Sequence, residues 1–172
     1  FAKEKDFSKG LIDSSVIETN IKGHQKYFDE FQPDFLKLMS DGFFGYPSEV
    51  IAQATTAEEL WNVKAVGEEH PWIQEQVKLV KELTKRFGSE VVTFYNIFSP
   101  LTFFQIIREG KGSKTAAEFF HENPKAFAHA LDQISEDLQI LVRQVIRDAK
   151  VDGIYFSVKN IQDPLVTVEE YL

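Results

Sequence analysis

Pro33-Asp34-Phe35-Leu36-Lys37-Leu38-Met39-Ser40-Asp41-Gly42-Phe43-Phe44-Gly45-Tyr46-Pro47 is the stretch that decides the expected fold. The apolar run over residues 35–39, interrupted by Lys37, is bounded by turn residues and is typical of a strand buried on both faces. The run gives way to a loop rich in glycine and aromatic residues just after Asp41. Loops and active sites gather at the carboxyl ends of parallel strands, so Asp41 is a candidate catalytic residue. The alternative is that Asp41 only caps the Asp-Gly turn.

Lys37, Met39 and Asp41 share one face of this strand, because side chains alternate with a period of two. A lysine inside an apolar strand is costly unless its charge is compensated. Three placements remain open for Lys37: an ion pair with Asp41, the wall of a polar cavity for a carboxylated substrate, or an exposed strand from which its ammonium reaches water.

The composition narrows the class of protein. The chain has 172 residues, 43% of them hydrophobic, with 16 phenylalanines, which is enough for one domain with an aromatic core. A net charge of −8 and a pI near 5.0 argue against binding to nucleic acids and to anionic membranes. There is no cysteine and no apolar run of membrane-spanning length. The expected localisation is cytoplasmic.

The remaining pattern alternates helices with two further strands. Strands separated by helical crossovers predict a parallel sheet with helices packed outside it, an α/β fold. Apolar spacings of three and four residues predict the helices, and β-branched and aromatic runs predict the strands. The expected helices cover residues 14–31, 48–54, 73–87, 99–109, 113–121, 124–149 and a last one starting near 163; the expected strands cover 34–39, 91–98 and 153–158.

Three segments in this order resemble the uroporphyrinogen decarboxylase superfamily: residues 33–43, Ile97-Phe98-Ser99-Pro100-Leu101-Thr102, and Val151-Asp152-Gly153-Ile154-Tyr155-Phe156-Ser157. The resemblance implies a TIM (β/α)₈ barrel in a protein about twice this length, since such barrels need roughly 250 residues. Residues 1–172 are therefore expected to form the N-terminal half of one barrel domain, with about three parallel strands and outer helices. The sequence resembles a divergent branch of the superfamily.

The resemblance also implies a chemistry. Members decarboxylate the acetate groups of a tetrapyrrole without a cofactor, and Asp41 matches the aspartate that binds the pyrrole N–H groups and stabilises the developing cation. Ile106 and Lys159 stand where the decarboxylases have a tyrosine and a serine, and Lys37 is an addition. One alternative is a corrinoid (methylcobamide) methyltransferase, whose zinc ligands fall outside this chain. Another, of a different class, is a non-catalytic binding or assembly module.

Other residues near the strand ends are candidates for substrate contact. The aromatic residues after Asp41 are expected to line a flat, hydrophobic cavity, with loop packing as the alternative. Ser99 fits a helix cap better than a ligand contact. Besides the catalytic candidate Asp41, the expected substrate-binding residues are Lys37, Met39, Phe43, Phe44, Tyr46, Asn96, Phe98, Tyr155 and Ser157.

No metal site is expected within this segment, because no paired histidine spacing occurs. His24, His121 and His129 are expected on outward-facing helix positions, and His70 in a loop or cap. The expected partner is a small molecule, a tetrapyrrole or corrinoid. Because the predicted sheet has two uncovered edge strands, the chain is also expected to self-associate or to contact the remaining half of the barrel.

Overall fold

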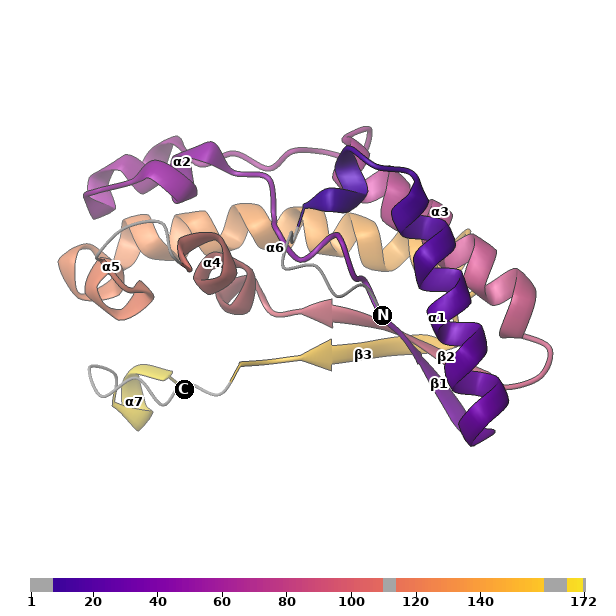
Figure 1. Ribbon diagram of the computed structural model, residues 1–172. Coiled ribbons are helices and arrows are strands. Elements are labelled where there is room, and N and C mark those ends of the chain that lie inside the picture. The colour runs from indigo at the N-terminus through magenta and orange to yellow at the C-terminus, as the bar shows by residue number, and fades with distance from the viewer. Residues whose placement is uncertain (1–7, 110–113, 160–166, 172) are drawn as a thin grey trace.

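The computed structural model describes residues 8–109, 114–159 and 167–171 (Figure 1). It confirms an α/β fold in which helices and parallel strands alternate along the chain. The strands are β1 (Phe35–Leu38), β2 (Val92–Phe98) and β3 (Gly153–Ser157). The α-helices are α1 (Ser15–Phe31), α2 (Glu49–Gln53), α3 (Pro71–Phe87), α4 (Pro100–Arg108), α5 (Ala116–Glu122), α6 (Pro124–Arg147) and α7 (Val168–Tyr171), and the 3₁₀ helices are η1 (Lys9–Leu11) and η2 (Ala57–Asn62).

The three strands form one parallel sheet in the order β1-β2-β3. Leu38 is in register with Tyr95, and Asn96 with Tyr155. Successive strands are joined by helical crossovers, as parallel pairing requires. The arrangement is that of a partial TIM-barrel-like fold, as the sequence predicts. The sequence predicts a last helix from about residue 163. Residues 163–166 lie outside the described residues, and α7 begins at Val168.

The apolar runs at β1 and β2 predict strands buried on both faces, and this is corrected, because the two faces of the sheet differ sharply in burial. Helices α3 and α6 lie along one side of the strands (Figure 1). Alternate residues on that side are fully buried, among them Leu36, Leu38 and Tyr95. The residues between them point to the other face, where Phe35 is 51% exposed and Tyr155 is 44% exposed. In a closed barrel this second face would be the inner one, and we call it the inner face below.

The starts of the helices follow the capping residues in the sequence. The Ser48 and Ser99 side chains accept hydrogen bonds from the main-chain N–H groups of Ile51 and Thr102, and so satisfy donors that the first turn leaves unpaired. Ser99 is thus a helix cap, as the sequence favours. His70 caps α3 in the same way, by accepting from the main-chain N–H of Trp72.

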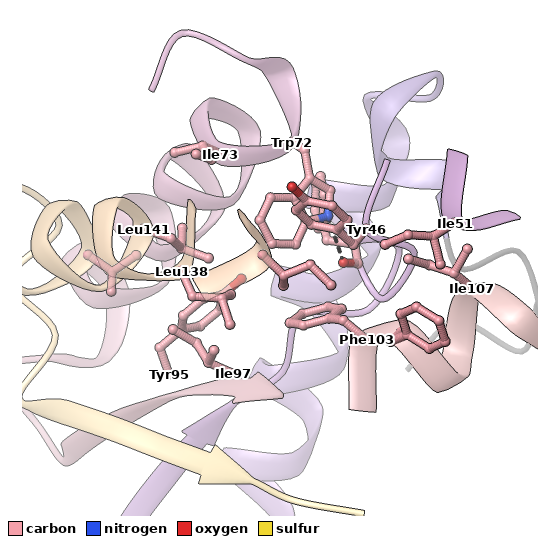
Figure 2. Close-up of a cluster of buried hydrophobic side chains, with 14 of the residues drawn as sticks. Tyr46, Ile51, Trp72, Ile73, Tyr95, Ile97, Phe103, Ile107, Leu138 and Leu141 are labelled. Carbon is pink, nitrogen blue, oxygen red and sulfur yellow. Dashed lines mark hydrogen bonds between the residues drawn. The ribbon is translucent and has the colours of Figure 1, made fainter. Parts of the chain in front are cut away.

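The core lies between the sheet and helices α3, α4 and α6. Figure 2 shows its centre, where Tyr46, Trp72 and Phe103 pack ring against ring. The Tyr46–Trp72 and Trp72–Phe103 pairs are close to edge-on, the arrangement that aromatic quadrupoles favour. The indole N–H of Trp72 donates to the main-chain oxygen of Phe43 at 3.1 Å, so the polar atom of the ring is paired although it is buried.

Among the described residues, no helix has the length and apolar character needed to cross a bilayer.

Candidate functional site

The carboxyl ends of the three strands lie together, as parallel pairing requires. The pairing of β2 with β3 continues past the strands, because the Ser99 N–H donates to the Ser157 carbonyl at 2.9 Å. Lys37, Met39, Asn96, Phe98, Tyr155 and Ser157 share the inner face by alternation and register. These are six of the ten residues that the sequence nominated.

Asp41 follows the end of β1, in a turn that its own side chain does not close. The Phe43 N–H donates to the Ser40 carbonyl at 2.9 Å, so the turn is held by the main chain. The Asp41 carboxyl is partly buried, and its Oδ2 has no hydrogen-bond partner among the described residues. Burial raises the pKa of this carboxyl above its usual value. Within the described residues, no hydrogen bond joins the Asp41 carboxyl to the turn, so the cap is not seen there, and a catalytic role for Asp41 stays a prediction.

Two contacts fix the main chain at Asp41. The side-chain amide of Asn20, on α1, donates to the Asp41 carbonyl at 3.0 Å. The Gly10 N–H donates to the Gly42 carbonyl at 2.9 Å. Gly42 has a φ of 90°, and a Cβ atom there would lie 2.6 Å from a methyl group of Val16. The position therefore requires glycine, and the carboxylate is carried on a loop with little freedom.

Asn96 lies on the inner face of β2 and is 1% exposed. The Ser157 hydroxyl donates to Asn96 Oδ1 at 2.7 Å, which fixes the orientation of the amide. Asn96 Nδ2 is buried and has no hydrogen-bond partner in the part of the chain that the structure describes. An unpaired buried donor is costly, so a position like this is one where a bound molecule gains a strong contact.

Lys37 does not pair with Asp41 within the described residues. Its Nζ instead lies 4.0 Å from the centroid of the Tyr155 ring, which brings the ammonium across β2 to β3. Burial lowers the pKa of the Lys37 ammonium below its usual value. Lys37 and Met39 also line a hollow of ≈ 400 Å³ beside β1, together with Tyr27 and Phe35. Of the placements that the sequence leaves open, the ion pair with Asp41 is not found within the described residues, and a role in a substrate cavity stays a prediction.

The aromatic residues after Asp41 divide into two groups. Phe44 is partly buried and meets Phe98 at 5.1 Å between ring centroids, so this pair lies at the strand ends. Phe43 and Tyr46 are 0% and 3% exposed. The expectation that both line a substrate cavity is corrected, because their rings are packed in the core beneath Gly10 and beside Trp72.

Tyr46 is held by a residue that the sequence analysis missed. Its hydroxyl donates to Oδ2 of Asp137, which is fully buried on α6. Asp137 also accepts from the main-chain N–H groups of Val66 and Gly67 at 2.8 and 2.9 Å. A carboxylate with three donors needs no ligand. Asp137 therefore belongs to the framework behind the site.

His24 is also placed differently from the expectation. It is fully buried rather than outward-facing, because its imidazole joins α1 to the end of β1. Nδ1 donates to the Asn20 carbonyl at 2.7 Å, and Nε2 accepts from the Met39 N–H at 2.9 Å. Burial lowers the pKa of His24, in agreement with a neutral ring that both donates and accepts. His121 is exposed, and His129 is half-buried with its Nε2 3.1 Å from the Val63 carbonyl.

A metal centre finds no support in the part of the chain that the structure describes, where no three His, Cys, Asp or Glu residues are grouped suitably. The zinc of the methyltransferase alternative is expected on residues outside this chain, so that alternative stays a prediction. The groups found near the strand ends are the Asp41 carboxylate, the Asn96 amide donor and the Phe44 and Phe98 rings, whereas the Lys37 ammonium, from within β1, lies over the Tyr155 ring.

A comparison with protein-family models matches residues 45–161 to the uroporphyrinogen decarboxylase (URO-D) family. No curated protein matches the chain. The matched segment covers more than half of the chain and contains Asn96, Phe98, Tyr155 and Ser157, whereas Lys37 and Asp41 precede it. The parallel strands, their helical crossovers and this match define an α/β barrel-type protein. The chain belongs to the URO-D superfamily.

Proposed function

We propose that this chain supplies the strand-end carboxylate of a URO-D-like enzyme that decarboxylates a tetrapyrrole-type substrate without a cofactor. The observation that carries the proposal is Asp41 Oδ2, a buried acceptor with no partner among the described residues, just past the end of a parallel strand. Membership of the superfamily supplies the reaction class. The residue itself supplies the acceptor that this reaction needs.

The proposed reaction replaces an acetate side chain by a methyl group. A proton adds to the pyrrole ring and creates a cation. The bond to the carboxylate then breaks, its electron pair neutralises the ring, and CO₂ leaves an exocyclic methylene. A second proton converts the methylene to methyl as the ring loses the first. The net change is one proton consumed and one CO₂ released for each acetate.

Asp41 acts in this scheme by charge and by hydrogen bonding. An ionised carboxylate accepts N–H bonds from pyrrole rings and stabilises the positive charge that develops on them. Burial raises the pKa of the free Asp41 carboxyl, which means that its charge is under-solvated before a ligand arrives. A cationic ring with N–H donors compensates that cost, and most strongly when the charge is largest. The contact therefore favours the transition state over the substrate.

The test is release of CO₂ from uroporphyrinogen under anaerobic conditions, with binding followed by quenching of tryptophan fluorescence. Asp41→Asn keeps the shape of the side chain and removes its charge, so we expect the rate to fall about 10²-fold or more. Asp132→Asn, at an exposed position of α6, is the control and should leave the rate unchanged. Equal rates for wild type and Asp41→Asn, or no CO₂ release by the wild type, contradict the proposal.

A further inference from the structure

Besides Asp41, a cluster of side chains in contact lies on the inner face of the sheet. It consists of Lys37, Asn96, Tyr155 and Ser157. Asn96 and Tyr155 are register partners on β2 and β3. Lys37, on β1, reaches the same place, because its Nζ lies 4.0 Å from the centroid of the Tyr155 ring. Residues from all three strands therefore converge on one point of the sheet.

Two side chains at this point, Asn96 and Lys37, carry hydrogen-bond donors that a ligand can engage. Asn96 Nδ2 is buried and has no partner within the described residues, and the Ser157 hydroxyl, which donates to Asn96 Oδ1, holds the amide in this orientation. Among the described residues, no carboxylate forms an ion pair with Lys37, whose charge rests on the face of an aromatic ring. A cation on a ring face keeps its N–H donors free for a further partner.

We propose that Lys37 and Asn96 bind a carboxylate group of the substrate above the Tyr155 ring. The two oxygens of a carboxylate match one charged donor and one neutral donor that come from neighbouring strands. The substrate is then one that carries a second carboxylate besides the one that is lost. The identity of that substrate rests on the proposed function, but binding of a carboxylate at this point does not.

The charge of the chain favours a local positive group for a polyanionic substrate. With a net charge of −8, residues 1–172 taken together repel anions. A fixed ammonium on the inner face offsets that repulsion locally and at short range. Lys37 lies in β1 and Asp41 follows the end of that strand. The proposed anion site at Lys37 and the proposed site at Asp41 for N–H groups and positive charge therefore lie along the same strand.

Small probes separate the two sites. Benzoate carries a carboxylate without a pyrrole, and pyrrole-2-carboxylate carries both. Pyrrole-2-carboxamide keeps the ring and the shape and lacks the charge. Affinities are measured by NMR chemical-shift titration of the ¹⁵N-labelled chain, in which shifts of the Tyr155 and Asn96 amides report the location.

Three variants test the assignment. Lys37→Met removes the charge and keeps the apolar stem, and Asn96→Asp turns the donor into an acceptor of nearly equal shape. We expect each to weaken benzoate and pyrrole-2-carboxylate about tenfold and to leave the carboxamide unchanged. Lys85→Met, at an exposed position near the end of α3, is the control and should change nothing.

The outcomes distinguish this site from the proposed function. Asp41→Asn should weaken both pyrrole probes and leave benzoate unchanged; if it does not, the pyrrole-binding role of Asp41 fails while the carboxylate site stands. If benzoate binds Lys37→Met as it binds the wild type, or shifts only amides away from Tyr155, the carboxylate site is overturned. Equal binding of carboxylate and carboxamide by the wild type overturns it as well.

Discussion

The Tyr46 hydroxyl donates a 2.6 Å hydrogen bond to the Asp137 carboxylate, across 91 positions of sequence and within the core. The same carboxylate accepts from the main-chain N–H groups of Val66 and Gly67. One buried group thus connects the loop after β1, the loop before α3 and helix α6. Burial and the neighbouring carboxylate raise the pKa of Tyr46, so the hydroxyl stays protonated and can donate.

Removing either partner should cost stability, and by different amounts. Tyr46→Phe leaves Asp137 with two donors, and we expect a loss of about 1–2 kcal/mol in the free energy of unfolding. Asp137→Ala leaves the buried Tyr46 hydroxyl and the partly buried N–H groups of Val66 and Gly67 without their partner, and we expect about 3–5 kcal/mol. Urea denaturation measures both. Asp132→Ala, at an exposed position of the same helix, should stay within about 0.5 kcal/mol. A loss for Asp137→Ala no larger than for Tyr46→Phe contradicts the shared role.

His24 should make the stability depend on pH. Burial lowers its pKa in the folded state, whereas the unfolded chain takes up a proton near the ordinary value of 6.5. Below that pH the unfolded state binds more protons, so stability falls as the solution is acidified, by up to ~1.4 kcal/mol per pH unit. Unfolding measured between pH 7.5 and 5.5 tests this. His24→Gln should flatten the slope, and His121→Gln, at an exposed position, should retain it.

Substitutions at Gly42 and Gly67 can separate the cost of backbone strain from the cost of a steric clash of the added Cβ atom. Both have positive φ, of 90° and 85°. A Cβ atom at Gly42 meets Val16 at 2.6 Å, whereas at Gly67 it meets nothing within 4 Å. We expect Gly67→Ala to cost about 1 kcal/mol from backbone strain alone, and Gly42→Ala to cost about 1–3 kcal/mol more. Thermal or urea unfolding of the two variants measures the difference, and equal losses would show that the loop at Asp41 is loosely packed.

Self-association is expected from the edge of the sheet. Within the described residues β3 pairs only with β2, and Phe156 and Val158 are 57% and 50% exposed. An open apolar edge of this kind recruits other strands. Sedimentation velocity should therefore show association that increases with concentration, and Phe156→Glu should reduce it. Ile12→Glu, which removes an apolar side chain 83% exposed and away from the sheet, should not. A single monomer boundary at every concentration for the wild type contradicts this prediction.

The sequence predicted those features that repeat with a period. The short apolar runs at β1 and β2, and the three- and four-residue spacings of α3 and α6, predicted the elements, their order and the parallel sheet. Register then placed Asn96, Tyr155 and Ser157 on one face with Lys37. Periodic patterns are reliable because each repeats the same choice between core and solvent several times.

The misplaced and missed residues are those whose burial the apolar period does not decide. Phe43, Phe44 and Tyr46 follow one another in a loop, and composition does not say which rings turn inward; only Phe44 lies at the strand ends. His24 and Asp137 are polar residues whose burial depends on partners 15 to 91 positions away. Their burial follows from hydrogen bonds that only the folded chain assembles.

The hydrogen bond from Ser157 to Asn96 has a consequence for the supply of protons. A hydroxyl has a single hydrogen, and at Ser157 that hydrogen is directed at Asn96 Oδ1. The Ser157 hydroxyl oxygen therefore offers only its lone pairs to an incoming molecule. It can accept a hydrogen bond from an N–H or O–H group but cannot act as an acid. Each proton that a decarboxylation consumes must enter by another route, and replacing Ser157 by alanine should disturb the fit of the ligand rather than abolish the protonation step.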